Sequence, residues 1–285
     1  MTNELETYRR EIDAFDDQIA SLLQARLSVV KKVGEYKHRH ASKLCPIRPG
    51  REATMLRRIA QIFTGSPFSP AAAAQLWRII IGTSTALEAK LSISVYAPDD
   101  NRDLFWLARE YFGPSAIITR QPHAKRVIGD VMDGTAAVGV IPPLSADIES
   151  NWWSHLLQAG ADNPKIFAHL PFVYHSEDPK QFPSALAFSR VLPEDSGDDV
   201  SVFVLAADHN VSQNRLQTEF SNANLSAQWL TIGSLSDAER HHVIELQGFV
   251  TPEHEGFKKF LAAMGDSLAQ VYFLGAYAVP FTIKT

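Results

Sequence analysis

The first forty residues constrain the fold most strongly, because they predict one long amphipathic helix over residues 4–40. Apolar side chains recur there at alternating steps of three and four, the spacing of a helix that packs against other helices: Leu5, Tyr8, Ile12, Phe15, Ile19, Leu22, Val29 and Val33. The step after Leu22 falls on Arg26, where this pattern calls for an apolar residue. Lys37 lies eleven residues later, which is about three turns and returns to nearly the same face.

A cation that faces a helical interior is costly unless an opposite charge neutralises it. Two interpretations of Arg26 and Lys37 remain open. In the first, Arg26 pairs with a neighbouring carboxylate of the protein, or Lys37 extends outward near the helix end. In the second, an anionic ligand binds both cations. The net charge of −5 excludes a general attraction to nucleic acid or to an anionic membrane, so any anion binding must be local.

Two further helices are expected before residue 90. A loop with two prolines and a glycine, residues 41–50, is followed by a helix from Arg51 to about Phe63 and another from Pro70 to Lys90. Two short-linked helices cannot cover the full length of the first one. We therefore expect a second copy of the chain to cover the remainder, which gives an intertwined homodimer.

From residue 91 the pattern changes to alternating strands and helices, which predicts an α/β unit with parallel strands over residues 91–193. Its last strands are expected over residues 165–174 and 185–192. An acidic, turn-forming segment, residues 193–199, is predicted to be a linker. The order β-α-β-β-α-β follows over residues 199–285, with its second helix expected over residues 255–268, and is typical of a ferredoxin-like fold. The predicted fold class is multidomain, with domains over 1–90, 91–193 and 199–285.

The helical domain offers few residue types for catalysis. Arg51 and Glu52 begin the second helix, and Ser84 and Glu88 lie four apart on one face of the third. The chain has one cysteine, Cys45, and shows neither metal-ligand spacing nor a nucleophilic set in this domain, so we expect no disulfide, metal or cofactor. Such a pocket suits a small dianion whose reaction needs electrostatic stabilisation.

Arg9 is separated from Arg26 by seventeen residues, or about 25 Å along the helix axis. Arg9 therefore cannot share a pocket with Arg26 of its own chain, but it is placed to reach the pocket of an antiparallel partner. No secretory signal and no apolar run of about 20 residues is visible. A cytoplasmic protein that spans no membrane is expected.

Residues 4–90 resemble the all-helical chorismate mutases. Several separated motifs carry this resemblance in the right order: Tyr-Arg-Arg-Glu-Ile-Asp with Arg9, Leu-Leu-Gln-Ala-Arg with Arg26, Val-Gly-Glu-Tyr-Lys with Lys37, Arg-Pro-Gly-Arg-Glu-Ala with Arg51 and Glu52, and Gly-Thr-Ser-Thr-Ala-Leu-Glu with Ser84 and Glu88. The resemblance implies conversion of chorismate to prephenate by an intramolecular Claisen rearrangement.

The same resemblance implies a role for each residue. Arg26 and the partner subunit's Arg9 would hold the two carboxylates of chorismate, with help from Ser84 and Arg51. Lys37 would donate to the ether oxygen, where negative charge builds as the C–O bond breaks, and Glu52 would accept from the ring hydroxyl. Holding the compact, chair-like conformer adds an orientational contribution.

Two positions depart from the family pattern. Arg48-Pro49-Gly50 stands where the family loop often supplies an acid, and Glu88 stands where the family commonly has glutamine. A carboxylate facing the ether oxygen would repel the developing charge, so Glu88 is expected to work only when protonated. Activity should then fall as rising pH removes that proton. The alternative for Glu88 is an ordinary salt bridge at the helix end.

The remaining two thirds of the chain are similar to a reduced prephenate dehydratase region followed by an ACT-like domain. The similar segments are residues 109–113, 131–142, 189–191, 246–249 and 273–277. Residues 141–145 lack the acid and amide expected there, and little chain remains between Ile148 and Arg190 for a second lobe. The ACT signatures that bind phenylalanine are not found. We expect a tail that no longer dehydrates and that serves assembly or regulation.

Several functions remain open beside a chorismate mutase of this kind. The chain is alternatively a non-catalytic regulator of aromatic amino-acid synthesis, or a working bifunctional chorismate mutase–prephenate dehydratase. An isochorismate lyase on a similar helical scaffold is a further alternative. Prephenate, phenylpyruvate or pyruvate as the product would separate the enzymes, and an absence of turnover would indicate the regulator.

Overall fold

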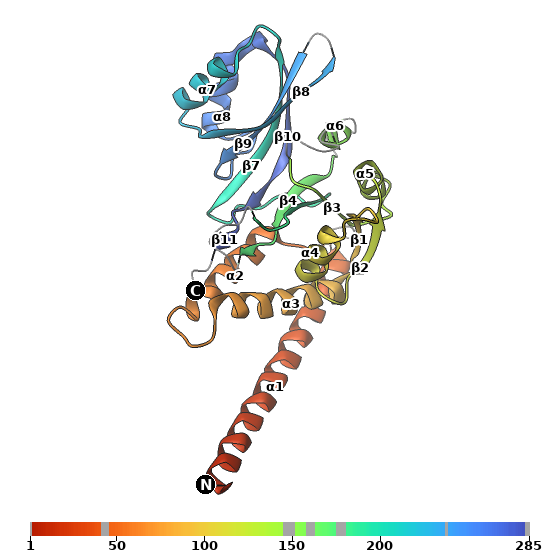
Figure 1. Cartoon of the computed structure of the whole chain (residues 1–285), viewed down its shortest axis with the longest axis vertical. Helices are drawn as coiled ribbons and strands as arrows, with labels where there is room; N and C mark the ends of the chain where they lie inside the picture. Colours follow the sequence, from red (N-terminus) through yellow and green to blue (C-terminus); the bar gives the residue numbers. More distant parts are fainter. Residues whose placement is uncertain are drawn as a thin grey trace.

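A computed structural model describes residues 2–40, 46–144, 152–157, 163–174, 181–236 and 239–282. Cys45 and Ser145, which carried expectations above, lie outside these residues. Figure 1 shows one long helix projecting from one end of the molecule, a large sheet in the middle, and a pair of helices at the opposite end.

The three predicted helices of the first ninety residues are present as α1 (Thr2–His40), α2 (Pro49–Ile62) and α3 (Pro70–Glu88). Helix α2 begins two residues earlier than predicted. Proline is favoured in a first helical turn because its φ angle already suits a helix and its missing N–H needs no partner there. The C-terminal part of α1 contacts α3, whereas the rest of α1 extends into solvent.

The apolar stripe of α1 is uncovered within one chain. Phe15 and Leu22 keep 62% and 70% of their surface exposed, and Leu5, Tyr8, Ile12, Ile19, Val29 and Val33 are exposed as well. A contiguous apolar stripe of this length is typical of an interaction surface. It agrees with the expectation that α2 and α3 cannot cover α1, and the homodimer remains a prediction.

The rest of the chain is organised around one nine-stranded sheet. Its strands are β1 (Ser92–Tyr96), β2 (Ile117–Gln121), β3 (Val138–Ile141), β4 (Lys165–Leu170), β6 (Ala185–Ser189), β7 (Asp199–Asp208), β8 (Ala227–Ser236), β9 (Glu239–Gln247) and β10 (Leu268–Ala278), in the order β2-β1-β3-β6-β4-β10-β7-β9-β8. Strands β1, β2 and β3 are parallel, as the alternating pattern predicted. A small parallel pair, β5 (Val173–Tyr174) and β11 (Phe281–Thr282), lies apart.

Helices α4 (Asp103–Phe112), α5 (Ala124–Met132) and α6 (Trp152–Leu157) pack on the first part of this sheet. The second part has the order β7-α7-β8-β9-α8-β10, so the ferredoxin-like order predicted from the sequence is confirmed. Its helices α7 (Gln213–Asn222) and α8 (Glu255–Met264) cover one face, where the rings of Phe220 and Phe260 stack with centroids 3.9 Å apart.

Three predicted extents are wrong. The strand expected over residues 165–174 is divided into β4 and β5 at Pro171, which has no N–H to continue the ladder. The helix expected over residues 255–268 ends at Met264, because Gly265 adopts a positive φ of 49° and is followed by the short 3-10 turn η3 (Gly265–Ser267). The strand expected over residues 185–192 ends at Ser189.

Strands β4 and β10 connect the two parts of the sheet, pairing at Ile166 and Gly275. One sheet therefore runs through both predicted domains of the tail, and the boundary drawn at residues 193–199 remains a prediction. Residues 192–198 contain no helix or strand, which agrees with a connecting segment.

Candidate active site

The candidate site lies where the C-terminal half of α1 meets the end of α3. Nη1 of Arg26 donates to Oγ of Ser84 at 2.5 Å, and this hydroxyl donates in turn to the carbonyl oxygen of Ile80 at 2.7 Å. Arg26 is partly buried and Ser84 is buried. The inward cation predicted from the helical pattern is therefore held by a hydroxyl, and among the described residues no carboxylate forms an ion pair with it.

The electrostatic surroundings of Arg26 include both signs of charge. Burial lowers the pKa of Arg26 most, the charge of Arg51 lowers it further, and the charge of Glu88 raises it. Arg51 and Glu88 thus act on the same guanidinium from α2 and α3. Two cations held close together favour the binding of an anion between them.

Lys37 and Glu88 form an ion pair at the same end of α1. Nζ of Lys37 lies 2.6 Å from Oε2 of Glu88, and both side chains are largely buried. Nε2 of His38 lies 3.3 Å from the carbonyl oxygen of Glu88, which also ties the end of α3 to α1. Beside Lys37 lies a hollow of about 790 Å³, also lined by Arg48, Lys90 and Arg190, so Lys37 borders open space.

Glu52 lies on the other side of α2, against α3. Its Oε2 is 2.6 Å from Nη2 of Arg78, and its Oε1 accepts from the backbone N–H of Arg48 at 3.3 Å. The guanidinium of Arg78 lies 4.4 Å from the ring centre of Tyr111 on α4, and burial raises the pKa of Tyr111 to about 12. Glu52 is buried in this contact, whereas Arg51 beside it is exposed.

Arg78 and Tyr111 were not identified from the sequence. Arg78 carries the same signal as Arg26, because it occupies a helix face with Ile81 and Thr85, both buried. A systematic search for charges on apolar helix faces would have found it.

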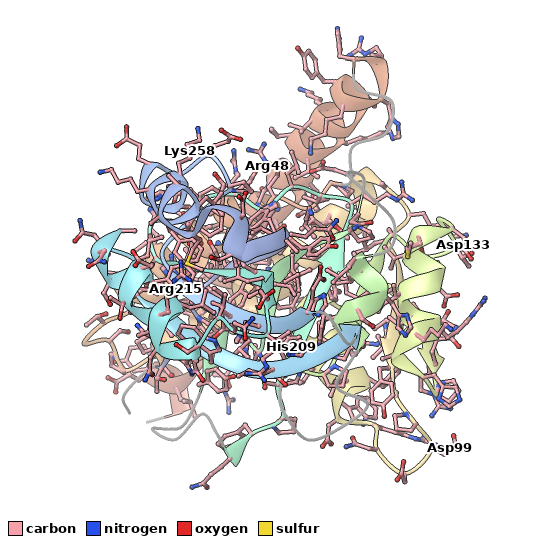
Figure 2. All side chains as sticks on the ribbon, turned by 90° about the horizontal axis from the view of Figure 1, so that it is seen from above. Arg48, Asp99, Asp133, His209, Arg215 and Lys258 are labelled. Atoms are coloured by element: carbon pink, nitrogen blue, oxygen red, sulfur yellow. The ribbon has the colours of Figure 1, made fainter. Side chains whose placement is uncertain are left out.

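Arg9 lies on the projecting half of α1, is exposed, and pairs with Glu6 at 2.8 Å. The structure therefore brings Arg26, Lys37, Arg51, Ser84 and Glu88 together, leaves Arg9 remote within one chain, and places Glu52 against Arg78. In the end-on view of Figure 2, Arg48 lies near the base of α1, and Asp99, just after β1, lies at the opposite edge of the molecule.

Residues 8–89 match the family described as chorismate mutase type II. Those residues are a chorismate mutase type II domain. A bifunctional chorismate mutase/prephenate dehydratase of Aquifex aeolicus (strain VF5) is 31% identical over 143 residues, which are 49% of this chain and 38% of that protein. The chain therefore spans well under half the length of this relative. The alignment is longer than the matched mutase region, so part of it lies outside residues 8–89.

Solved structures resemble a large part of the chain. GqqA, described as a novel type of quorum quenching acylase, is 13% identical with a TM-score of 0.50, over 66% of this chain and 95% of that one. A prephenate dehydratase from Streptococcus mutans is 14% identical with a TM-score of 0.49, over 67% and 99% of the two chains. At 13% identity, the likeness to GqqA concerns the fold alone.

In the dehydratase-like region, the residues singled out from the sequence have ordinary partners. Oγ of Ser189 accepts from the backbone N–H of Val191 at 3.0 Å, and Nη2 of Arg190 donates to the carbonyl oxygen of Met132 at 2.7 Å. Within the residues the structure describes, no group of three or more His, Cys, Asp or Glu side chains is arranged to hold a metal ion. No helix among them is long and apolar enough to cross a membrane.

Proposed function

We propose that this protein is a chorismate mutase that converts chorismate to prephenate through its helical domain. The observation that carries this proposal is the contact of Arg26 with Ser84. A partly buried guanidinium on a helix face is held by a hydroxyl, next to Arg51, and keeps its charge for an anionic ligand. Electrostatic stabilisation by preorganised donors suits a rearrangement that forms no covalent intermediate with the enzyme.

Each candidate residue has a place in this reaction. Arg26 and the partner subunit's Arg9 bind the two carboxylates, and Arg51 and Ser84 assist. Lys37 donates to the ether oxygen as the C–O bond breaks, for which it must exchange its contact with Glu88. The resulting charge on the oxygen is greatest in the transition state, so this contact lowers the barrier.

In this proposal Glu52 accepts a hydrogen bond from the ring hydroxyl while it keeps its ion pair with Arg78. An ionised carboxylate has about four acceptor positions on two oxygens, so one carboxylate can accept from both. Its buried contact with Arg78 gives Glu52 a second role, which is to hold α2 against α3.

The proposed assembly is a homodimer through α1. The uncovered apolar stripe supports it, and so does the position of Arg9, which only an antiparallel second chain would bring to the site. The tail is proposed to be non-catalytic and to serve assembly or regulation. The cytoplasmic location predicted from the sequence stays part of the proposal, as does the expectation that neither nucleic acid nor a membrane is a partner.

The test is a chorismate assay with product identification on the full chain. Wild type should consume chorismate and release prephenate, and Arg26→Ala should lower kcat/KM by about 10²-fold or more, as the loss of an anion-stabilising donor does. Arg10→Ala, an equal change at an exposed position of the same helix, serves as the control and should stay near wild type. Binding of chorismate without turnover would indicate the non-catalytic regulator instead, pyruvate release a lyase, and phenylpyruvate an active dehydratase region.

A further inference from the structure

Helix α2 carries a charged residue, Arg51, whose position beside another cation is electrostatically unfavourable. Its Arg51 lies close enough to Arg26 of α1 to lower the pKa of that guanidinium, so the two like charges repel each other. Repulsion between like charges opposes the placement of the start of α2 beside α1. Contacts elsewhere must hold α2 in place if Arg51 is to help bind a dianion.

Arg57, on the same helix, makes an extensive set of such contacts with the tail. Its Nη1 donates to the carbonyl oxygen and to Oγ of Ser196, at 3.1 and 3.0 Å. Its Nη2 donates to the carbonyl oxygens of Asp198 and Val279, at 2.8 and 3.0 Å. The guanidinium also lies 5.5 Å from the ring centre of Phe172. A planar guanidinium satisfies several fixed acceptors at once, which a single ammonium group cannot reproduce.

Arg78 holds the same helix from the side of α3. It pairs with Glu52, the residue after Arg51, and each of the two side chains keeps only 9% of its surface exposed. Among the described residues, Nε and Nη1 of Arg78 have no hydrogen-bond partner, so Glu52 is the main neutralising contact of this buried charge. Tyr111 of α4 covers the guanidinium, so the dehydratase-like region closes this contact.

The connecting segment of the tail lies directly against the first turn of α2. A Cβ atom built on Gly50 would lie 2.7 Å from the carbonyl oxygen of Asp195 and 2.8 Å from Cβ of Glu194. Glu194 also pairs with Arg48 just before the helix. A glycine is needed here because no side chain fits between the two backbones.

We propose that the tail forms part of the mutase site by fixing α2, with Arg57 and Arg78 as positioning residues for Arg51. This inference rests on the proposed function. It gives the non-dehydrating tail a definite role, which is to hold one wall of a neighbouring active site rather than to bind a substrate of its own.

The kinetic signature follows from the role of Arg51. A displaced Arg51 weakens binding of the carboxylates in the ground state and in the transition state alike, which raises KM and changes kcat little. We expect Arg57→Ala to raise KM for chorismate about tenfold, with kcat within about threefold of wild type, since small misplacements of a binding group are costly. Partial unfolding would instead lower the active fraction and leave KM unchanged.

Three variants of the full chain make the test. Arg57→Lys keeps the charge but fewer of the hydrogen bonds, so its KM should lie between wild type and Arg57→Ala, and it carries the test if the alanine variant does not fold. Arg58→Ala is the control. Arg58 is exposed and lies seven residues after Arg51, on the same face of α2. Its replacement by alanine removes an equal charge, so this variant reports any effect of charge alone. Its KM should stay within about threefold of wild type.

Hydrogen exchange of the amides over residues 49–62 gives a second readout that needs no turnover. Exchange should be faster in Arg57→Ala than in Arg58→Ala, whereas α8 should be equally protected in both. Equal KM values for Arg57→Ala and Arg58→Ala in folded protein would overturn the inference. If wild type does not turn over chorismate, the proposed function fails, and unchanged protection of α2 in Arg57→Ala would then overturn the positioning role as well.

Discussion

At the scale of single residues, two arginines on apolar helix faces differ in their partners. Arg26 is held by the hydroxyl of Ser84, and Arg78 by the carboxylate of Glu52. A carboxylate neutralises a guanidinium, whereas a hydroxyl orients it and leaves the charge in place. The nature of the partner therefore separates a cation that can bind an anion from one that holds two helices together. A sequence shows the misplaced cation but not its partner, so the contact between Glu52 and Arg78 was not predicted.

Glu88 supplies a prediction at the same scale. Its carboxylate lies 2.6 Å from the ammonium group of Lys37, which is the proposed donor to the ether oxygen. Glu88→Gln removes the competing charge and offers an N–H donor, so kcat/KM at neutral pH should rise about tenfold, the equivalent of one charge-assisted hydrogen bond. The decline of wild-type activity with rising pH that the sequence predicts should be absent in the variant. The measurement is kcat/KM for chorismate from pH 5 to 8.

Glu35→Gln is the matched control for this profile, because it removes an equal charge at an exposed position of α1. Its pH dependence should follow that of wild type. A Glu88→Gln profile as steep as the wild-type profile would leave Glu88 as the ordinary salt bridge that the sequence also allowed.

At the scale of helices and strands, periodicity located most elements, and close backbone approaches explain much of what it missed. The three helices, the parallel strands and the ferredoxin-like order all follow from local patterns of apolar residues and turn residues. The contact of residues 193–199 with α2 does not, because it joins segments about 140 residues apart and depends on a glycine that reads as an ordinary loop residue. The break at Pro171 is visible in the sequence as a proline, which cannot continue a strand ladder.

Gly82 marks a second close approach, between α3 and the end of α4. A Cβ atom there would lie 2.5 Å from the carbonyl oxygen of Phe112, which is backbone and cannot easily move. Gly82→Ala should therefore lower the free energy of unfolding by about 1–3 kcal/mol, the usual cost of overpacking. Urea denaturation of the full chain measures this change.

Gly129 in α5 provides the matched control. A Cβ atom at Gly129 meets nothing within 4 Å, and alanine is the better helix former, so Gly129→Ala should be neutral or stabilising by up to about 1 kcal/mol. Equal unfolding free energies for the two variants would show that α3 and α4 adjust freely to the added methyl group.

At the scale of the whole molecule, the tail and the first helix differ in how far a single chain completes them. The tail is closed by its own sheet, which runs from β2 to β8, and by the contacts of α2. The first helix is open, with its apolar stripe exposed and Arg9 far from Arg26. An isologous dimer would cover the stripe and bring Arg9 of each chain to the site of the other, so each of its two sites would need both chains.

Mixed dimers test that arrangement directly. Arg9→Ala and Arg26→Ala should each lower kcat/KM by about 10²-fold or more, because each damages both sites of a dimer. A heterodimer of the two variants, purified through two different affinity tags, contains one site with both arginines and one site with neither. It should recover about half of the wild-type activity, as the symmetry requires. A heterodimer of two differently tagged Arg9→Ala chains is the control and should stay inactive. If the mixed dimer is no more active than its parents, the two arginines do not act across the subunit boundary. If Arg9→Ala alone keeps wild-type activity, one chain completes its own site.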